Sequence, residues 1–140
     1  MTVKLDPYIN FRDNAREAME FYHSVLGGEV SFSTFGEFGM SDEPAEKDLI
    51  MHSMLQTPGG LSFMAADTPS SMPFAPTAGF ALTVSGTMAD EEELRGYWNK
   101  LAEGATLTMP LDKAPWGDYF GMLTDRFGVD WMFDFGNPQE

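Results

Sequence analysis

The 140 residues suit one domain or two small fused modules, and a hydrophobic content of 43% is enough to build a core. Acidic residues outnumber basic ones by 22 to 8, and the formal net charge of −14 argues against nucleic acid and anionic membranes as partners. The lack of cysteine excludes disulfides, thiolate zinc sites and cysteine nucleophiles. No apolar run suits a signal peptide or reaches the ~20 residues of a membrane span, so we expect a cytoplasmic protein.

The first half of the chain predicts the order strand, helix, strand, strand, strand. A strand is expected over residues 3–11 and a helix from Asn14, with Glu17 completing a capping box. Apolar residues at helical spacing predict one buried helix face: Ala15, Ala18, Met19, Tyr22, Val25 and Leu26. Three further strands are expected: 29–35, 49–56 and 61–66. The last two are joined by a turn at 57–60.

Residues 67–76 are rich in proline and serine and predict a linker, after which the pattern starts again. A helix is expected over 90–103, with one buried face: Leu94, Tyr97, Trp98 and Leu101. Strands are expected in three places: 80–84, 105–109 and a hairpin within 119–135. A loop through Pro110 and Pro115 precedes the hairpin, and Asp125 is expected to make the hairpin turn.

The two halves share a residue spacing that indicates an internal repeat. The corresponding pairs are Met54 and Met122, Gly60 and Gly128, Met64 and Met132, Phe63 and Trp131, Tyr22 and Tyr97, and Leu26 and Leu101. We therefore predict a single α+β domain over 1–140, with one βαβββ module at 1–66 and a second at 77–136. Two curled mixed sheets, each with a helix on its outer face, would enclose a cavity.

Four stretches carry a family resemblance: PYINFRDNAREAMEFYHSVLGGEV (7–30), IMHSML (50–55), LAEGATLTMPL (101–111) and WGDYFGMLTDRFGVDWM (116–132). Together with the repeated βαβββ unit, they resemble the vicinal oxygen chelate superfamily of glyoxalase I, bleomycin-resistance proteins and extradiol dioxygenases. Within it the chain is most similar to the PhnB-like family. The resemblance covers nearly the whole chain, and its last stretch is the most specific.

The resemblance also implies where a divalent metal would be held in glyoxalase-type members. Each module supplies a histidine from its first strand and a carboxylate from its last strand. The four matching positions in this chain are Pro7, Gly79, Met64 and Met132. Proline and glycine have no ligand side chain, and a thioether is a soft ligand that suits Cu(I) at best. We therefore expect a cavity without the superfamily metal and without another cofactor.

Six residues are candidates for lining this cavity: Tyr8, His52, Met64, Trp116, Phe120 and Met132. His52 is also the candidate for catalysis, because histidine titrates near neutral pH. The alternative for His52 is a strand histidine that is satisfied by a neighbour or by solvent. Trp116 is either a lid over the cavity or a packed anchor of its loop, and Asp118 caps a turn or orients Trp116.

Two functions remain open. The protein could bind a small apolar or aromatic molecule without transforming it, as bleomycin-resistance proteins sequester their drug. It could instead be a lyase- or dioxygenase-type enzyme that uses His52 and nearby carboxylates, or an unusual metal site. The residues do not support a methyltransferase, because the chain has no glycine-rich strand-to-helix turn for S-adenosylmethionine. We expect a homodimer, because exposed edge strands gain from being covered.

Overall fold

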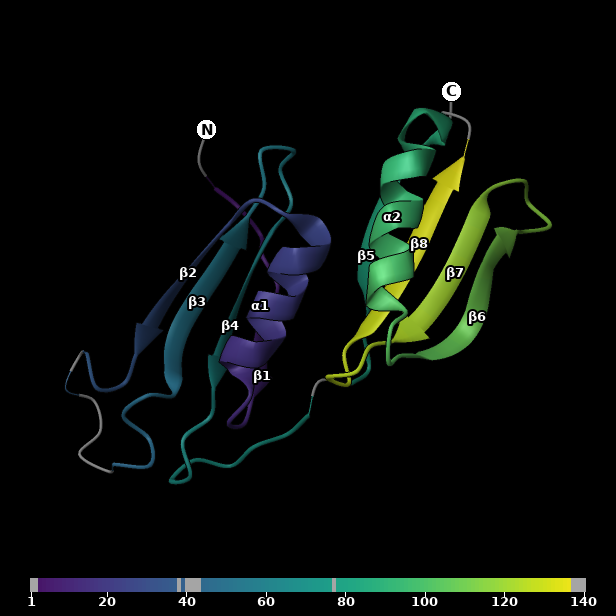
Figure 1. The fold of residues 1–140 in the computed structure, drawn as a ribbon. Helices are drawn as coiled ribbons and strands as arrows, with labels where there is room; N and C mark the ends of the chain where they lie inside the picture. Colours follow the sequence, from purple (N-terminus) through teal and green to yellow (C-terminus); the bar gives the residue numbers. More distant parts are fainter. Residues whose placement is uncertain (1–2, 38, 40–43, 77, 137–140) are drawn as a thin grey trace. The chain divides into compact units, whose positions relative to one another are not determined.

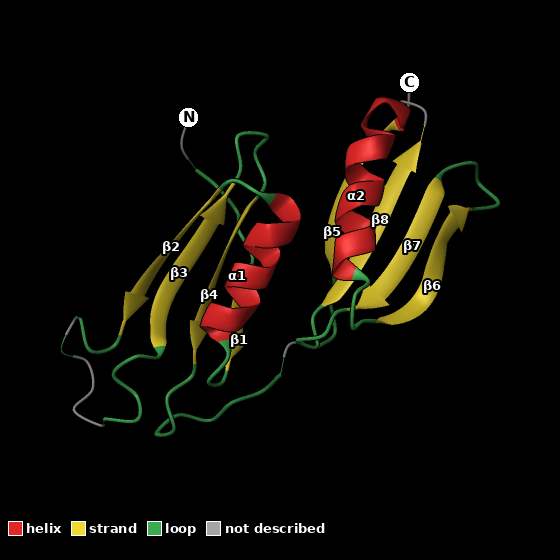
Figure 2. Ribbon diagram, in the orientation of Figure 1, coloured by secondary structure: helices red, strands yellow, loops and turns green. Residues whose placement is uncertain are grey.

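The computed structural model describes residues 3–37, 39, 44–76 and 78–136, which form two compact units, Met1–Pro76 and Thr77–Glu140. Each unit is a four-stranded mixed sheet with one helix against it (Figures 1 and 2). The predicted α+β class with two βαβββ modules is therefore confirmed. Residues 1–2 and 77, at the predicted starts of the two modules, lie outside the described residues. No described helix combines the length and apolar character needed to cross a membrane.

The sheet of the first unit has the order β1-β4-β3-β2. Its elements are β1 (Tyr8–Phe11), α1 (Ala15–Leu26), β2 (Glu29–Thr34), β3 (Ile50–Gln56) and β4 (Ser62–Asp67). Strand β1 is parallel to β4, and the other pairs are antiparallel. The first strand is shorter than predicted and starts only after Pro7, which has no N–H to offer a ladder.

Helix α1 has the predicted N-cap, Asn14, but the predicted capping box is wrong. Asn14 makes no side-chain cap bond. The carboxylate of Asp67, which is only 4% exposed, caps the helix instead, because its Oδ1 accepts from the Ala15 N–H at 2.9 Å. Its Oδ2 accepts from the Ile50 N–H, also at 2.9 Å. One buried carboxylate thus joins the helix start, β3 and β4, and its charge suits a helix N-terminus.

The core of the first unit lies between α1 and its sheet. All six residues of the predicted helix face are buried. They meet a second set of buried side chains from the sheet, which includes Ile9, Phe11, Leu55, Phe63 and Ala65. Tyr22 packs edge-on against Phe63, with ring centroids 5.5 Å apart and planes at 70°. Residues 67–76 belong to this unit, and Arg12 holds them by donating to the carbonyls of Pro69 and Met72 at 3.2 and 2.5 Å.

The sheet of the second unit has the matching order β5-β8-β7-β6. Its elements are β5 (Leu82–Thr87), a 3₁₀ turn (Met88–Asp90), α2 (Glu91–Leu101), β6 (Thr106–Lys113), β7 (Tyr119–Thr124) and β8 (Asp130–Gly136). Strand β6 continues through Pro110, so the predicted loop is wrong at Pro110, whereas Pro115 does lie in the loop between β6 and β7. The strand can include Pro110 because β6 is an edge strand, where a missing N–H is tolerated, and its pairing with β7 shifts register twice.

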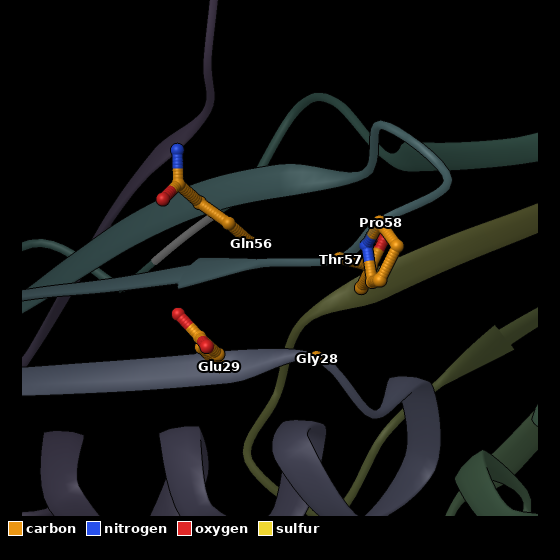
Figure 3. Close-up of a pocket in the computed structure, with 5 residues that line it drawn as sticks. All are labelled: Gly28, Glu29, Gln56, Thr57 and Pro58. Atoms are coloured by element: carbon orange, nitrogen blue, oxygen red, sulfur yellow. The ribbon is translucent and has the colours of Figure 1, made fainter.

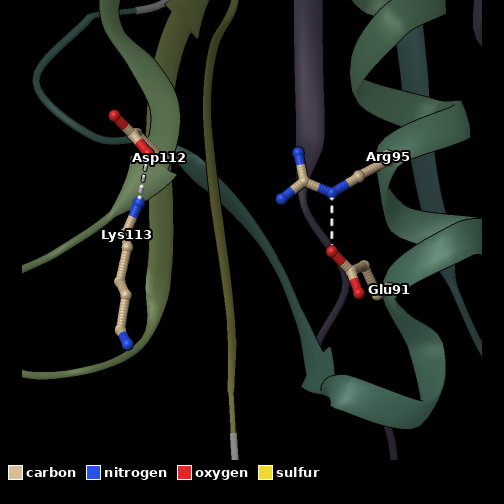
Figure 4. Close-up of polar contacts among 4 residues, drawn as sticks. All are labelled: Glu91, Arg95, Asp112 and Lys113. Atoms are coloured by element: carbon tan, nitrogen blue, oxygen red, sulfur yellow. Dashed lines mark hydrogen bonds and ion pairs between the residues drawn. The ribbon is translucent and has the colours of Figure 1, made fainter.

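Helix α2 buries Leu94, Trp98 and Leu101 as predicted, but Tyr97 is only half-buried and bonds through its hydroxyl to Glu93. Arg95 ties the helix to its sheet, because its guanidinium lies 5.1 Å from the ring centroid of Tyr119. Arg95 also pairs with Glu91 at 2.9 Å (Figure 4). Figure 4 shows a second polar contact on β6, where the Lys113 N–H donates to the side chain of Asp112 at 2.8 Å.

The hairpin turn before β8 is made by Asp125, as predicted. This carboxylate is 4% exposed and accepts at Oδ1 from the Phe127 and Val129 N–H groups, at 2.8 and 3.1 Å. Its Oδ2 accepts from the indole N–H of Trp131 at 2.9 Å. Thr57 has the corresponding place in the first unit, where its hydroxyl accepts from the Leu61 N–H at 3.1 Å. In both turns the side chain of the first residue accepts a hydrogen bond from the backbone N–H four residues later. Asp125 accepts two further hydrogen bonds.

Candidate functional site

Strand alternation divides the residues of each sheet between two faces. We call the face opposite the helix of the same unit the helix-free face. In β4 the buried Phe63 and Ala65 face α1, so Met64 lies on the helix-free face. In β8 the buried Trp131 and Phe133 face α2, so Met132 lies on the helix-free face of the second unit.

On the first unit this face brings together three of the six predicted site residues. Tyr8 lies opposite Met64 in the parallel pair β1–β4. The His52 Nε2 is 3.4 Å from the Met64 Sδ, and the rings of Tyr8 and His52 have centroids 6.2 Å apart. Met54, which sequence reasoning did not select, faces Met64 across the antiparallel pair β3–β4. Partial burial raises the pKa of the Tyr8 phenol above its ordinary value of 10.0.

The other three predicted residues belong to the second unit. Phe120 and Trp116 are in edge contact, with ring centroids 5.6 Å apart. Met122, which pairs with Met132 across β7–β8, follows Phe120 by two residues and therefore lies on the same face. Trp116 is 63% exposed although it touches Phe120, so it is not a buried anchor of its loop. Whether either group binds a ligand stays a prediction.

The two positions that the resemblance assigns to histidine, Pro7 and Gly79, lie outside the first strand of each unit. Pro7 precedes β1, and its carbonyl accepts from the Met64 N–H at 2.9 Å. Gly79 precedes β5, which begins at Leu82. The residues that pair with Met64 and Met132 are Tyr8 and Thr83. Each methionine therefore has a hydroxyl-bearing residue beside it, on a strand that begins later than predicted.

A pair of carboxyl groups on the second unit was missed by sequence reasoning. Asp134 is two residues from Met132 on the same face, and its pKa is raised by burial, by a hydrogen bond with Asp118 and by the charge of Asp118. Within the described part of the chain, Asp134 Oδ1 is buried without a hydrogen-bond partner. Asp118 lies so close to Gly136 that a Cβ there would come within 2.0 Å of its Oδ1. Alternation along 130–136 could have placed Asp134 beside Met132, but sequence reasoning considered Asp118 only as a turn cap or as a residue that orients Trp116, and no local signal pointed to its contact with Asp134.

A shallow hollow of about 490 Å³ lies elsewhere in the first unit (Figure 3). Its lining residues are Gly28, Glu29, Gln56, Thr57 and Pro58, none of which was predicted as a site residue. Gly28 is required there, because a Cβ would come within 2.2 Å of the Gln56 carbonyl oxygen. In the described ranges, no three His, Asp or Glu side chains are grouped so that they could hold a metal ion.

Comparison with known proteins assigns the family. Residues 4–133 match the family model of the Glyoxalase/Bleomycin resistance protein/Dioxygenase superfamily. The chain belongs to this superfamily. Among its relatives, protein YjdN of Escherichia coli K12 is 28% identical, over 96% of this chain and 97% of that protein.

Solved structures agree with this assignment. Protein PA1353 from Pseudomonas aeruginosa is 36% identical and superposes with a TM-score of 0.80, covering 98% of this chain and all of that chain (100%). A PhnB protein from Bacillus cereus, described as a putative 3-demethylubiquinone-9 3-methyltransferase, is 29% identical with a TM-score of 0.75, covering 95% of this chain and 99% of that one. The predicted superfamily and the PhnB-like resemblance are therefore confirmed.

Proposed function

We propose that this superfamily member binds a small apolar or aromatic molecule on its helix-free faces, without a divalent metal and without transforming the molecule. The observation that carries the proposal is the paired methionines. Met64 faces Met54 in the first unit, and Met132 faces Met122 in the second. Thioether side chains are flexible and polarisable, so they adapt to apolar and aromatic ligands.

Aromatic side chains beside these methionines add a second line of support. Tyr8 pairs with Met64 in the first unit. In the second unit, Phe120 lies on the same sheet face as Met132 and its ring contacts Trp116. Trp116 and Tyr8 are among the exposed large hydrophobic residues. Exposed aromatic rings offer flat surfaces for stacking, and burying them on a ligand gains free energy from the area removed from water.

The side chains at the superfamily positions favour an organic ligand over a hard cation. The resemblance assigns Met64 and Met132 to the carboxylate positions, and their strand neighbours are the hydroxyl-bearing Tyr8 and Thr83. Hard divalent ions prefer carboxylate and imidazole ligands to thioethers. We expect mass spectrometry of untagged protein, exposed to Zn, Ni, Mn and Fe and then desalted, to find almost none of them. One of these metals per chain would overturn the metal-free part of the proposal.

The binding proposal is tested by a thermal-shift screen of apolar and aromatic compounds, followed by calorimetry on the hits. Met64→Ala and Met132→Ala should each be compared with the wild type. Losing a buried methionine contact costs about 1.5–3 kcal/mol, or about tenfold to a hundredfold in Kd. Met72→Ala, at an exposed loop position, is the matched control and should bind as the wild type does. Hits whose affinity is unchanged by both Met64→Ala and Met132→Ala would contradict the proposal.

An enzyme of the superfamily's lyase or dioxygenase type is the second candidate, and the Asp118–Asp134 pair is the observation that favours it. A carboxyl group with a raised pKa can act as a general acid nearer to neutral pH. In the first unit, the buried carboxylate of Asp67 does not serve as a partner for His52, because its two oxygens accept hydrogen bonds from backbone N–H groups. Turnover of a lyase or dioxygenase substrate that is lost in both Asp134→Asn and His52→Phe would favour the enzyme.

We further propose a homodimer in the cytoplasm. Leu107 and Met109, on the edge strand β6, are 47% and 46% exposed, and covering such an edge would protect its unpaired backbone groups. Light scattering should give twice the chain mass of 15.5 kDa. A monomer at micromolar concentration would contradict the dimer, and recovery in a membrane fraction would contradict the location.

A further inference from the structure

Three side chains on the helix-free face of the first unit form a set of soft and borderline metal ligands. The His52 Nε2 lies 3.4 Å from the Met64 Sδ. Met54 pairs with Met64 across β3–β4 and follows His52 by two residues, so all three side chains lie on one face. We propose that His52, Met54 and Met64 bind one Cu(I) ion. This inference goes beyond the proposed function, because it adds a monovalent metal to a face proposed for organic ligands.

The chemistry of the ligands selects this ion. Thioether sulfur is soft and favours Cu(I), and imidazole nitrogen suits copper as well. The residues that pair directly with His52, Met54 and Met64 are all uncharged: Ser33, Ser31 and Tyr8. Neither the three ligands nor their paired neighbours include a carboxylate. A hard divalent cation would therefore find no anionic oxygen ligand to replace its bound water.

The separation of His52 Nε2 and Met64 Sδ suits two ligands of one ion. With bonds of about 2.0 Å to nitrogen and about 2.3 Å to sulfur, as zinc makes, the 3.4 Å separation gives an angle of about 104° at the ion. This angle is close to that of tetrahedral coordination. Binding would replace the imidazole–sulfur contact with two bonds to the metal, and neither strand would need to move far. The sulfur of Met54, on the same face, would be the third ligand.

The second unit supplies an internal control for this site. Its repeat positions hold Phe120, Met122 and Met132, so the methionine pair is kept and the imidazole is replaced by an apolar ring. A general affinity of methionines for soft ions would affect both units equally. A site that needs His52 would be confined to the first unit.

The test is an anaerobic Cu(I) titration of the full chain against bicinchoninate, a chromogenic chelator. We expect the wild type to withdraw one Cu(I) per chain. His52→Phe and Met64→Leu should each weaken binding at least tenfold, since losing even an outer-shell partner costs about 10–100-fold. Met122→Leu and Met132→Leu, the matched substitutions in the second unit, should bind as the wild type does. Far-ultraviolet circular dichroism verifies that each variant is folded.

Methyl NMR of the wild type with labelled methionine keeps the test independent of any variant. Added Cu(I) should shift the methyl signals of Met54 and Met64, and those of Met122 and Met132 should stay in place. A wild type that takes no Cu(I) from the chelator would overturn the site. The site would also be overturned if substitutions in both units weakened Cu(I) binding equally, or if all methionine methyl signals shifted. Either result would mean that thioethers bind Cu(I) without regard to their position.

Discussion

The two units have the same skeleton and differ on the face that each turns away from its helix. Both sheets place a methionine pair at the same position, Met54 with Met64 and Met122 with Met132. Beside that pair, the first unit has His52 where the second has Phe120. The repeat thus preserves packing and hairpin geometry, and the chemistry has diverged where side chains do not form the core.

The same divergence affects the ionisable groups. The second unit has a carboxyl pair, Asp118 and Asp134, at positions where the first unit has Ile50 and Ala66. The first unit places its buried carboxylate, Asp67, on the helix side and uses it as a cap. A buried carboxylate holds the backbone in each unit, Asp67 at the start of α1 and Asp125 at the hairpin turn, whereas the Asp118–Asp134 pair is found only in the second unit. The predictions below test this contrast.

The largest difference is expected at the repeated tyrosines of the two helices. Tyr22 is completely buried against Phe63, whereas Tyr97 is half-buried. Tyr22→Ala should cost about 3–5 kcal/mol of unfolding free energy, as truncation of a buried aromatic does. Tyr97→Ala should cost only about 1 kcal/mol, because a half-buried ring leaves little cavity behind. Urea unfolding of both variants measures the difference, and equal losses would show that the helices pack alike.

The two hairpin turns should differ by a smaller amount. Asp125 accepts three hydrogen bonds and is buried, whereas one bond is observed from Leu61 to the hydroxyl of Thr57. Asp125→Ala should cost about 3 kcal/mol, because buried donors lose a charged partner. Thr57→Ala should cost about 1 kcal/mol. Asp125→Asn is the conservative control and should recover part of the loss. A Thr57 substitution as harmful as that of Asp125 would contradict this ranking.

The smallest effect is expected from the carboxyl pair, and it depends on pH. The folded-state pKa of Asp134 is raised above its ordinary value of 3.8, so the folded protein holds that proton more tightly than the unfolded chain. Wild-type stability should therefore fall as pH rises from 3.8 through the folded-state pKa. Asp134→Asn should remove this fall and gain less than about 1 kcal/mol at neutral pH, since solvent screens the pair.

Unfolding free energies of both proteins between pH 3 and 8 check this prediction. The two curves should converge at the acid end, where Asp134 is protonated in the folded and the unfolded state alike. Curves that stay parallel over the whole range would show that Asp134 does not titrate with a raised pKa. Asp130→Asn, which makes the same chemical change on the same strand, is the matched control.

Much of each unit could be predicted from residue spacing. Helical periodicity found the buried face of α1, and glycine and aspartate patterns found both hairpins. The errors arose where a local rule met a tertiary exception. A proline such as Pro110 would end a strand in the interior of a sheet. Strand β6 is an edge strand, so it continues through the proline. Tyr97 fits the helical period, yet it lies at the side of α2, where its hydroxyl reaches Glu93.

By itself, the sequence determined the repeat and the alternation that places Met64 and Met132 on equivalent faces. Both are properties of short segments, because side chains alternate along any strand. Only the tertiary structure decided that Tyr8 and His52 meet Met64, that Asp67 caps α1, and that Asp118 meets Asp134. These contacts depend on the register between distant strands, and a shift of one residue would turn the side chains to the other face.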